Sequence, residues 1–294
     1  MASGKGRRMM AIVLSLLAAV IYGAGDFVGG LATRRVSALF VVGIGQVVGL
    51  PALAVLSLVL PAEQVRPADL WWGAASGLST AVGITLLYKA LATGRMSVVA
   101  PITALCALAV PVVFAFVVGL TVGLLAAAGI AVAALAVALI SREPDRVEAT
   151  QTATGRAVLL AVAAGLGIGV FYVTMGRTDP ASGLWPLVAA RGVSTALFTL
   201  GALVTLPRWR RAAAPMALLW QWAALSGLFD SAANALYLLA SREGNLAVVA
   251  TLTSLYPAST VFLAAVALGE RLRLAQIAGL GLATLAVVII VMGR

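Results

Sequence analysis

The sequence Trp71–Ala100 reads WWGAASGLSTAVGITLLYKALATGRMSVVA, and the sequence Gln221–Ala250 reads QWAALSGLFDSAANALYLLASREGNLAVVA. Continued for 70 positions, this alignment at a distance of 150 residues has no gap and contains 23 identities, among them Gly119 with Gly269. Apolar composition raises the number of chance identities, but it does not by itself produce an ungapped register with matched glycines. The chain is therefore predicted to contain an internal repeat.

The composition indicates that this repeat lies in lipid. Of the 294 residues 62% are hydrophobic and 10% charged, and the mean hydropathy is +1.09. A soluble domain is about half apolar and about a quarter charged. Because a membrane-spanning helix needs about 20 mostly apolar residues, we searched for such stretches. Ten spans are expected, at 10–31, 38–60, 70–92, 96–118, 120–140, 157–175, 184–206, 215–240, 246–268 and 274–293.

Each half of the chain thus contains five spans, and five is an odd number. A half that begins on one side of the membrane ends on the other, so the second copy must be inverted. Inverted repeats are typical of secondary transporters, whose site lies near the bilayer midplane between the halves. We therefore predict an all-α integral membrane protein with ten transmembrane helices in two inverted five-helix repeats, 1–145 and 150–294. In the earlier helices the alignment is looser and places Gly23 opposite Gly167.

The scarcity of histidine and cysteine argues against several classes of protein. The sequence contains no histidine and one cysteine, Cys106, so a metal site or a histidine-dependent triad is not expected. No cofactor is expected, and ATP is excluded as a direct energy source because no Walker-type glycine–lysine motif occurs. The net charge of +10 is spread over short connections rather than gathered on one face, so no nucleic-acid partner is expected.

The start of the chain and the orientation of the helices in the membrane each admit two interpretations. The basic start, Lys5 to Arg8, followed by an apolar run resembles a cleavable signal peptide, but the repeat needs this first span. Seven Lys and Arg residues fall on the side of the termini and eleven on the other side, which by the positive-inside rule favours termini outside. The flanks of the first span favour the reverse.

Short motifs along the chain resemble those of the drug/metabolite transporter superfamily, in its ten-helix EamA-like family. They are Tyr22–Phe27 (YGAGDF), Ser97–Pro101 (SVVAP), Leu246–Ala250 (LAVVA), Tyr256–Pro257 and Gly269–Leu272 (GERL), the last followed by Gln276 and Gly279. The resemblance implies a multi-pass protein of the inner (plasma) membrane with both termini in the cytoplasm. It also implies transport, more often export, of amino acids, other metabolites or drugs.

Four charged residues lie inside the predicted spans: Asp26, Lys89, Arg191 and Asp230. A charge near the bilayer centre costs at least about 2.5 kcal/mol, so it is usually paired or faces a wet cavity. Calculated from the helical rise, the depth of Asp26 in the membrane could match that of Lys89, and the depth of Arg191 lies within about one turn of that of Asp230. These are candidate ion pairs, and such pairs also occur as purely structural links between helices. Lys89 and Asp26 could alternatively extend to the interface.

Asp230 is the strongest candidate for a cavity residue. It lies near mid-span and shares a helical face with Asn234 and Tyr237. Thr80, the residue that aligns with Asp230 in the first half, is uncharged, so this polar face belongs to the second half only. A carboxylate held partly away from water could bind substrate or exchange a proton during transport.

Aromatic residues and prolines complete the candidate site. Six aromatic residues lie in or near these spans and are expected to shape a cavity, although helical aromatics are also common as packing residues: Tyr22, Phe27, Phe171, Tyr172, Tyr237 and Tyr256. Pro101 and Pro257 occur in helices that are repeat mates, where each interrupts the helical hydrogen bonds. Kinks at these prolines could act as a gate or could serve packing alone.

Together these features favour a secondary-active transporter of small organic metabolites, such as amino acids or related amphipathic compounds, over two alternatives. A membrane sensor or assembly protein would share the fold but show no flux of solute. A membrane-embedded enzyme would need a reactive cluster that the composition does not offer. The expected partners are the lipid bilayer, a small-molecule substrate and a coupling proton. Because one chain contains both halves, a monomer is expected.

The proton hypothesis predicts the behaviour of one variant. Replacing Asp230 with Asn removes the titrating carboxylate while keeping the side chain's shape, so the pH dependence of transport should flatten. Initial rates in vesicles between pH 6 and pH 8 measure this, and an unaltered pH profile would exclude Asp230 as the proton carrier.

Overall fold

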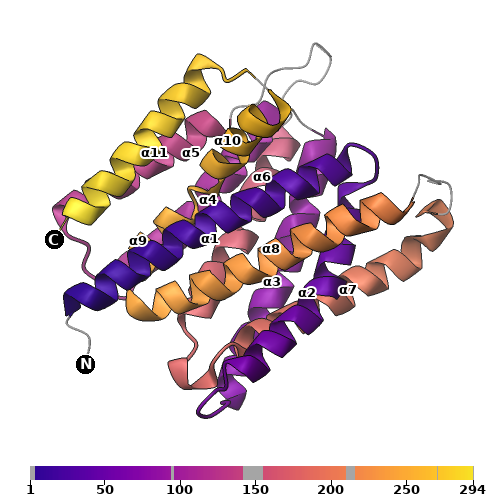
Figure 1. Cartoon of the computed structure of the whole chain (residues 1–294), viewed down its shortest axis with the longest axis horizontal. Helices are drawn as coiled ribbons and strands as arrows, with labels where there is room; N and C mark the ends of the chain where they lie inside the picture. Colours follow the sequence, from indigo (N-terminus) through magenta and orange to yellow (C-terminus); the bar gives the residue numbers. More distant parts are fainter. Residues whose placement is uncertain (1–3, 94–95, 142–154, 210–215, 270, 294) are drawn as a thin grey trace.

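The computed structural model describes residues 4–93, 96–141, 155–209, 216–269 and 271–293, which are almost entirely helical. Every predicted span contains a helix (Figure 1). The helices are α1 (Gly4–Thr33), α2 (Ala38–Val59), α3 (Pro67–Thr93), α4 (Met96–Val117), α5 (Leu124–Ile140), α6 (Gly155–Gly176), α7 (Trp185–Trp209), α8 (Met216–Glu243), α9 (Leu246–Thr253), α10 (Tyr256–Leu268) and α11 (Leu274–Met292), with a short 3₁₀ turn, η1 (Pro180–Ser182), before α7.

Glycine explains how two matched helices end. Gly119 follows α4 with φ of +76°, and Gly269 follows α10 with φ of +65°. A backbone in this left-handed region favours glycine because a Cβ atom would clash with the chain. The identity of these two positions in the repeat alignment therefore reflects the same turn, made once in each half.

The ninth predicted span differs from its expected form, because it consists of two helices, α9 and α10. The break falls at Ser254 and Leu255, directly before Tyr256 and Pro257. Proline has no N–H to continue the helical ladder and occupies the first turn of α10 instead. In the other half Pro101 lies inside the continuous helix α4. Only one of the two proline-containing mates is thus interrupted.

The packing of the helices repeats itself about a pseudo-twofold axis. Helix α1 packs against α8 as α6 packs against α3, and α2 packs against α8 as α7 packs against α3. The contact of α4 with α6 corresponds to that of α9 and α10 with α1. Helices α2 and α7, and α5 and α11, are mates that pack against each other. The two five-helix halves are therefore interlocked, and each supplies walls to the other.

Close contacts of glycines correct the register of the first helices. A Cβ atom on Gly23 would meet Ser259 and the backbone of Thr260, while one on Gly169 would meet Val110, which is the repeat mate of Thr260. Gly23 therefore corresponds to Gly169 rather than to Gly167. The looser sequence alignment was two residues out because the helix ends differ in length and composition.

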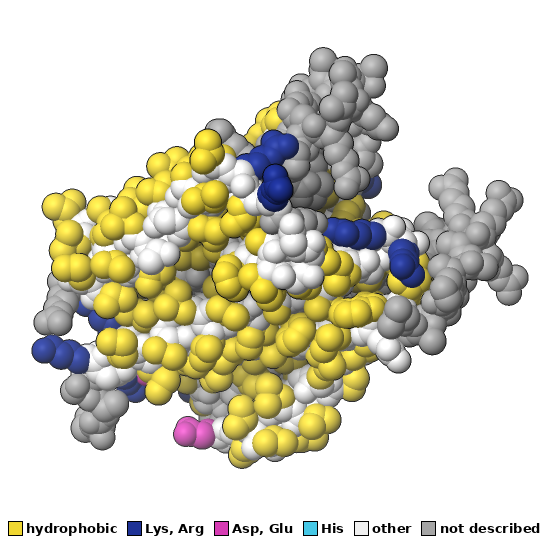
Figure 2. Space-filling model, turned by 45° about the horizontal axis from the view of Figure 1, so that its top comes forward, with side chains coloured by type: hydrophobic (Ala, Val, Ile, Leu, Met, Phe, Trp, Pro, Cys, Tyr) yellow, Lys and Arg dark blue, Asp and Glu magenta, His cyan; other side chains and the backbone are white. Residues whose placement is uncertain are grey.

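Both termini lie at the same end of the bundle (Figure 1). Arg8 Nη2 donates to the carbonyl of Gly293 over 2.6 Å, and Arg7 Nε lies 3.5 Å from a carboxylate oxygen of Glu243. We call this end the terminal side, and the other the opposite side. Between them the face shown in Figure 2 is covered by apolar side chains, with Lys and Arg at its margins, as lipid contact requires.

The tightest helix contact yields a testable prediction. A Cβ atom on Gly77 of α3 would lie 2.1 Å from the carbonyl oxygen of Ala190 of α7. Gly77→Ala must push these backbones apart, so it should destabilise the protein by about 1–3 kcal/mol. The control is Gly192→Ala, also on α7, where a Cβ atom meets nothing within 4 Å. Thermal unfolding in detergent measures both, and equal melting temperatures would contradict the packing described here.

Candidate central cavity

A cavity of about 690 Å³ lies between the two halves. Its lining comes from α1, α2 and α3 of the first half and from α6, α7, α8 and α10 of the second. Pockets that hold small organic molecules are usually about 300–1,000 Å³ and mostly apolar, with a few placed polar groups. This cavity fits that description.

The cavity opens toward the opposite side of the bundle. Its lining extends to Thr33 at the end of α1, Ala38 at the start of α2 and Leu91 near the end of α3. All three helix ends face away from the termini. At its other limit the cavity meets Leu53 and Leu187, which are buried.

Three aromatic residues close the cavity toward the terminal side. The ring of Tyr172 lies 5.5 Å from that of Phe171 and 4.7 Å from that of Tyr237, between centroids. Tyr237 is fully buried, and its hydroxyl donates to the carbonyl of Tyr172 over 2.8 Å. Edge-to-face rings with a satisfied hydroxyl form a well-packed apolar layer. We call these three residues the aromatic layer.

Beyond the aromatic layer lies a polar cluster, which we call the terminal latch: Arg66, Asp69, Asp179, Ser182 and Arg242. It joins the connection between α2 and α3 to the one between α6 and α7. Buried Asp69 accepts from the Ser182 hydroxyl over 2.6 Å, and Arg66 pairs with Asp179. Arg242 Nη2 donates to the carbonyl of Gly183 over 2.5 Å. The terminal side is therefore closed by two successive layers, one apolar and one polar.

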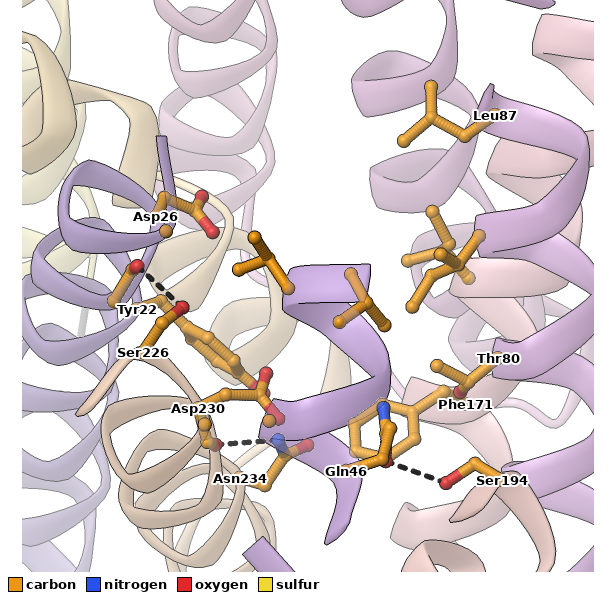
Figure 3. Close-up of a pocket in the computed structure, with 18 of the residues that line it drawn as sticks. Tyr22, Asp26, Gln46, Thr80, Leu87, Phe171, Ser194, Ser226, Asp230 and Asn234 are labelled. Atoms are coloured by element: carbon orange, nitrogen blue, oxygen red, sulfur yellow. Dashed lines mark hydrogen bonds between the residues drawn. The ribbon is translucent and has the colours of Figure 1, made fainter. Parts of the chain in front are cut away.

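The centre of the cavity wall contains a charged network around Arg191. Arg191 Nη2 lies 2.5 Å from Asp230 Oδ2 and 3.2 Å from Ser231 Oγ, while Nη1 donates to Gln46 Oε1 over 2.7 Å. Ser194 Oγ donates to the same Gln46 oxygen over 2.8 Å (Figure 3). The Arg191 side chain is 7% exposed, whereas that of Asp230 is 43% exposed to the cavity. The ion pair is thus buried on one side only.

Helix α2 makes room for this network. A Cβ atom on Gly49 would lie 2.4 Å from Ser231 Oγ and 3.3 Å from the guanidinium carbon of Arg191. A side chain at this position would therefore have to displace the Ser231 hydroxyl and would crowd the guanidinium. The glycine therefore allows a charge to lie between α2, α7 and α8 within the membrane.

Asp26 lies on the same wall, one turn after Tyr22 on α1, and its carboxylate is exposed to the cavity (Figure 3). Among the residues that the structure describes, none forms a hydrogen bond or ion pair with the Asp26 side chain. Lys89, its suggested partner, is exposed and lies outside the cavity lining. The structure therefore does not bring Asp26 and Lys89 together.

The ten residues predicted to line the cavity fall into two groups. Seven line the cavity: Tyr22, Asp26, Phe171, Tyr172, Asp230, Asn234 and Tyr256. Three do not: Phe27, Lys89 and Tyr237. Tyr237 lies behind the wall in the aromatic layer, and the amide of Asn234 donates to the Asp230 carbonyl over 2.7 Å. Pro101 and Pro257 also lie outside the lining.

Sequence reasoning missed several polar residues of the site, above all Gln46 and Ser194. Gln46 stands in the middle of an otherwise apolar span, so a search for uncharged polar residues at mid-span would have found it. Tyr88 and Thr80 also line the cavity. Their neighbours Ile84, Leu87 and Leu91 on α3 add apolar side chains to the lining. Figure 3 shows Leu87 across the cavity from Asp26 and Asp230.

A one-sided cavity between interlocked inverted repeats is an arrangement typical of membrane transporters. The sequence matches the EamA-like transporter family over residues 9–142 and 155–292. The chain belongs to this family, whose members are membrane transporters of the drug/metabolite type, and the match covers both repeats.

Solved structures support the fold. Twenty-eight chains of known structure match this one. One of them, described only as the crystal structure of a protein, superposes with a TM-score of 0.78 at 16% identity over 95% of each chain. Among curated proteins none matches the sequence.

The one-sided burial of the ion pair predicts an asymmetric response to mutation. Asp230→Asn leaves the arginine buried without a counter-ion and should cost about 2–3 kcal/mol of stability. Arg191→Met leaves a carboxylate that the cavity can hydrate, so its cost should be smaller. Thermal unfolding of both variants and of the double variant measures this. The double variant should be more stable than Asp230→Asn alone, and the reverse order would contradict the network.

Proposed function

We propose that this protein is a secondary-active transporter of small organic metabolites, such as amino acids or related amphipathic compounds, working by alternating access. The observation that carries the proposal is the cavity between the repeats, open to one side and closed to the other by two layers. An apolar wall and a polar wall that face each other suit a solute with both characters.

The inverted repeat suggests how the cavity changes sides. The main helix contacts of one half have counterparts in the other, so the arrangement that closes the terminal side can in principle be formed by the mates at the opposite side. Transport would then require the terminal latch and the aromatic layer to separate. The interrupted ninth span, α9 and α10, supplies a joint beside α1 and the cavity.

The finer features of the proposal rest on the family resemblance and the chain's own charges. We place both termini in the cytoplasm of an inner-membrane protein. The open cavity of this structure then faces away from the cytoplasm, which suits the release step of an exporter. Because a single chain lines the whole cavity, the monomer is proposed as the transporting unit. Coupling to protons is proposed at the carboxylates of the cavity.

Locking the closed side tests alternating access. The backbone N–H of Gln64 donates to the carbonyl of Ala181 over 3.0 Å, so these positions are adjacent across the terminal side. In a Cys106→Ser background, Gln64→Cys with Ala181→Cys should form a disulfide under oxidation. We expect transport in vesicles to fall at least about tenfold and to return on reduction. Solutes for this assay come from a thermal-shift screen of amino acids, related metabolites and cationic drugs.

Each single-cysteine variant serves as a control and should be insensitive to oxidant. Binding of solute to the oxidised protein should persist, because the cavity remains open to the opposite side. Full transport by the cross-linked protein would contradict alternating access through the terminal side. Binding without flux in the reduced protein would favour a sensor.

A further inference from the structure

The charged residues of the cavity lining do not balance. They are Asp26, Asp230 and Arg191, so the described lining has one carboxylate more than it has cations. Arg191 is held by Gln46, Asp230 and Ser231, to which its Nη1 and Nη2 donate. Asp26, by contrast, has no hydrogen-bond or ion-pair partner among the described residues. The excess negative charge is therefore located at Asp26.

An unpaired carboxylate inside a membrane is costly unless water or a counter-ion compensates it. The Asp26 side chain is exposed to the cavity, so a molecule that enters from the opposite side reaches it directly. A cation at this position would gain attraction that is much stronger than in bulk water, because protein and lipid surround the site. The negative charge of the cavity therefore favours binding of a cation.

Three tyrosines line the cavity together with this carboxylate: Tyr22, Tyr88 and Tyr256. Tyr22 lies one turn before Asp26 on α1, and its ring centroid is 6.0 Å from that of Tyr256. Tyr88 also lines the cavity, on the facing helix α3. The faces of aromatic rings attract ammonium groups, most strongly where water is scarce. Across the cavity, Leu87 offers an apolar surface for the rest of the molecule (Figure 3), and Ile84 of the same helix also lines the cavity.

Among the residues that the structure describes, the same lining offers no free cation for a carboxylate ligand. The two Arg191 nitrogens that face the network donate to Gln46, Asp230 and Ser231, and the side chain is 7% exposed. Lys89 lies outside the lining. A zwitterion or an anion would bring a negative charge into a cavity that already carries an excess of it.

From these observations we propose that the cavity binds an organic monocation, a protonated amine with an apolar or aromatic body and no carboxylate, with its ammonium group at Asp26. The proposal rests on the function proposed above and narrows its substrate class. Amines would be preferred over the corresponding amino acids.

Three matched compounds test this preference with the purified full-length chain in detergent. Phenethylamine, phenylalanine and 3-phenylpropanoate share one aromatic body and carry, respectively, the ammonium group, both charged groups and the carboxylate. Isothermal titration at pH 7.5, with empty micelles as the blank, should show phenethylamine binding at least about tenfold more tightly than either of the others. This comparison needs no variant.

Variants then locate the ammonium group. Asp26→Asn should weaken phenethylamine binding at least about tenfold, and Asp26→Glu, which keeps the charge, should largely restore it. Glu63→Gln removes an equal charge from an exposed position outside the cavity and should leave binding unchanged.

Three results would overturn the inference: equal or tighter binding of phenylalanine or 3-phenylpropanoate, unchanged phenethylamine binding by Asp26→Asn, or no phenethylamine binding by the unmodified protein. In the second case the ammonium group does not bind at Asp26. The function proposed above fails separately, if no solute crosses the vesicle membrane; flux of a solute that is not an amine would leave that function standing.

Discussion

Polar atoms in the hydrocarbon core of a membrane have no water to satisfy them, and this constraint shapes the whole molecule. Backbone groups satisfy it through helices, which make up nearly all of the described chain. Arg191 satisfies it through Gln46, Asp230 and Ser231, with Gly49 providing the space. Asp26 has no such partner among the described residues, and its side chain faces the cavity.

The two halves share a scaffold but differ in chemistry. Matched glycines and matched helix contacts preserve the fold in both repeats. Thr80 on α3 aligns with Asp230 on α8, and Ile84 aligns with Asn234; all four line the cavity. Helix α3 therefore contributes a mostly apolar wall and its repeat mate α8 a polar one. A symmetric fold produces an asymmetric cavity because aligned positions of the lining carry different side chains.

The two ends of the bundle are also unequal. The aromatic layer and the terminal latch close one end, while the cavity reaches the helix ends at the other. Both layers depend on residues distant in sequence, such as Asp69 with Ser182 and Tyr237 with Tyr172. Each layer uses a different kind of interaction, so a change of state would have to separate both.

The spacing of apolar residues determined the ten spans, and the odd number in each half determined their inversion, because a helix of given length must cross the bilayer completely. Charges inside the spans pointed to Asp26, Lys89, Arg191 and Asp230, since lipid makes every such residue conspicuous, and two ion pairs were expected among them. Sequence could not show that Arg191 pairs with Asp230 while Asp26 has no partner among the described residues. Nor could it show that Tyr237 lies behind the wall, or that Pro257 interrupts its helix and Pro101 does not. Those outcomes depend on how helices rotate and how closely they approach one another. Only the packed tertiary structure decides that, because contacts between residues far apart in the chain set the rotation of each helix.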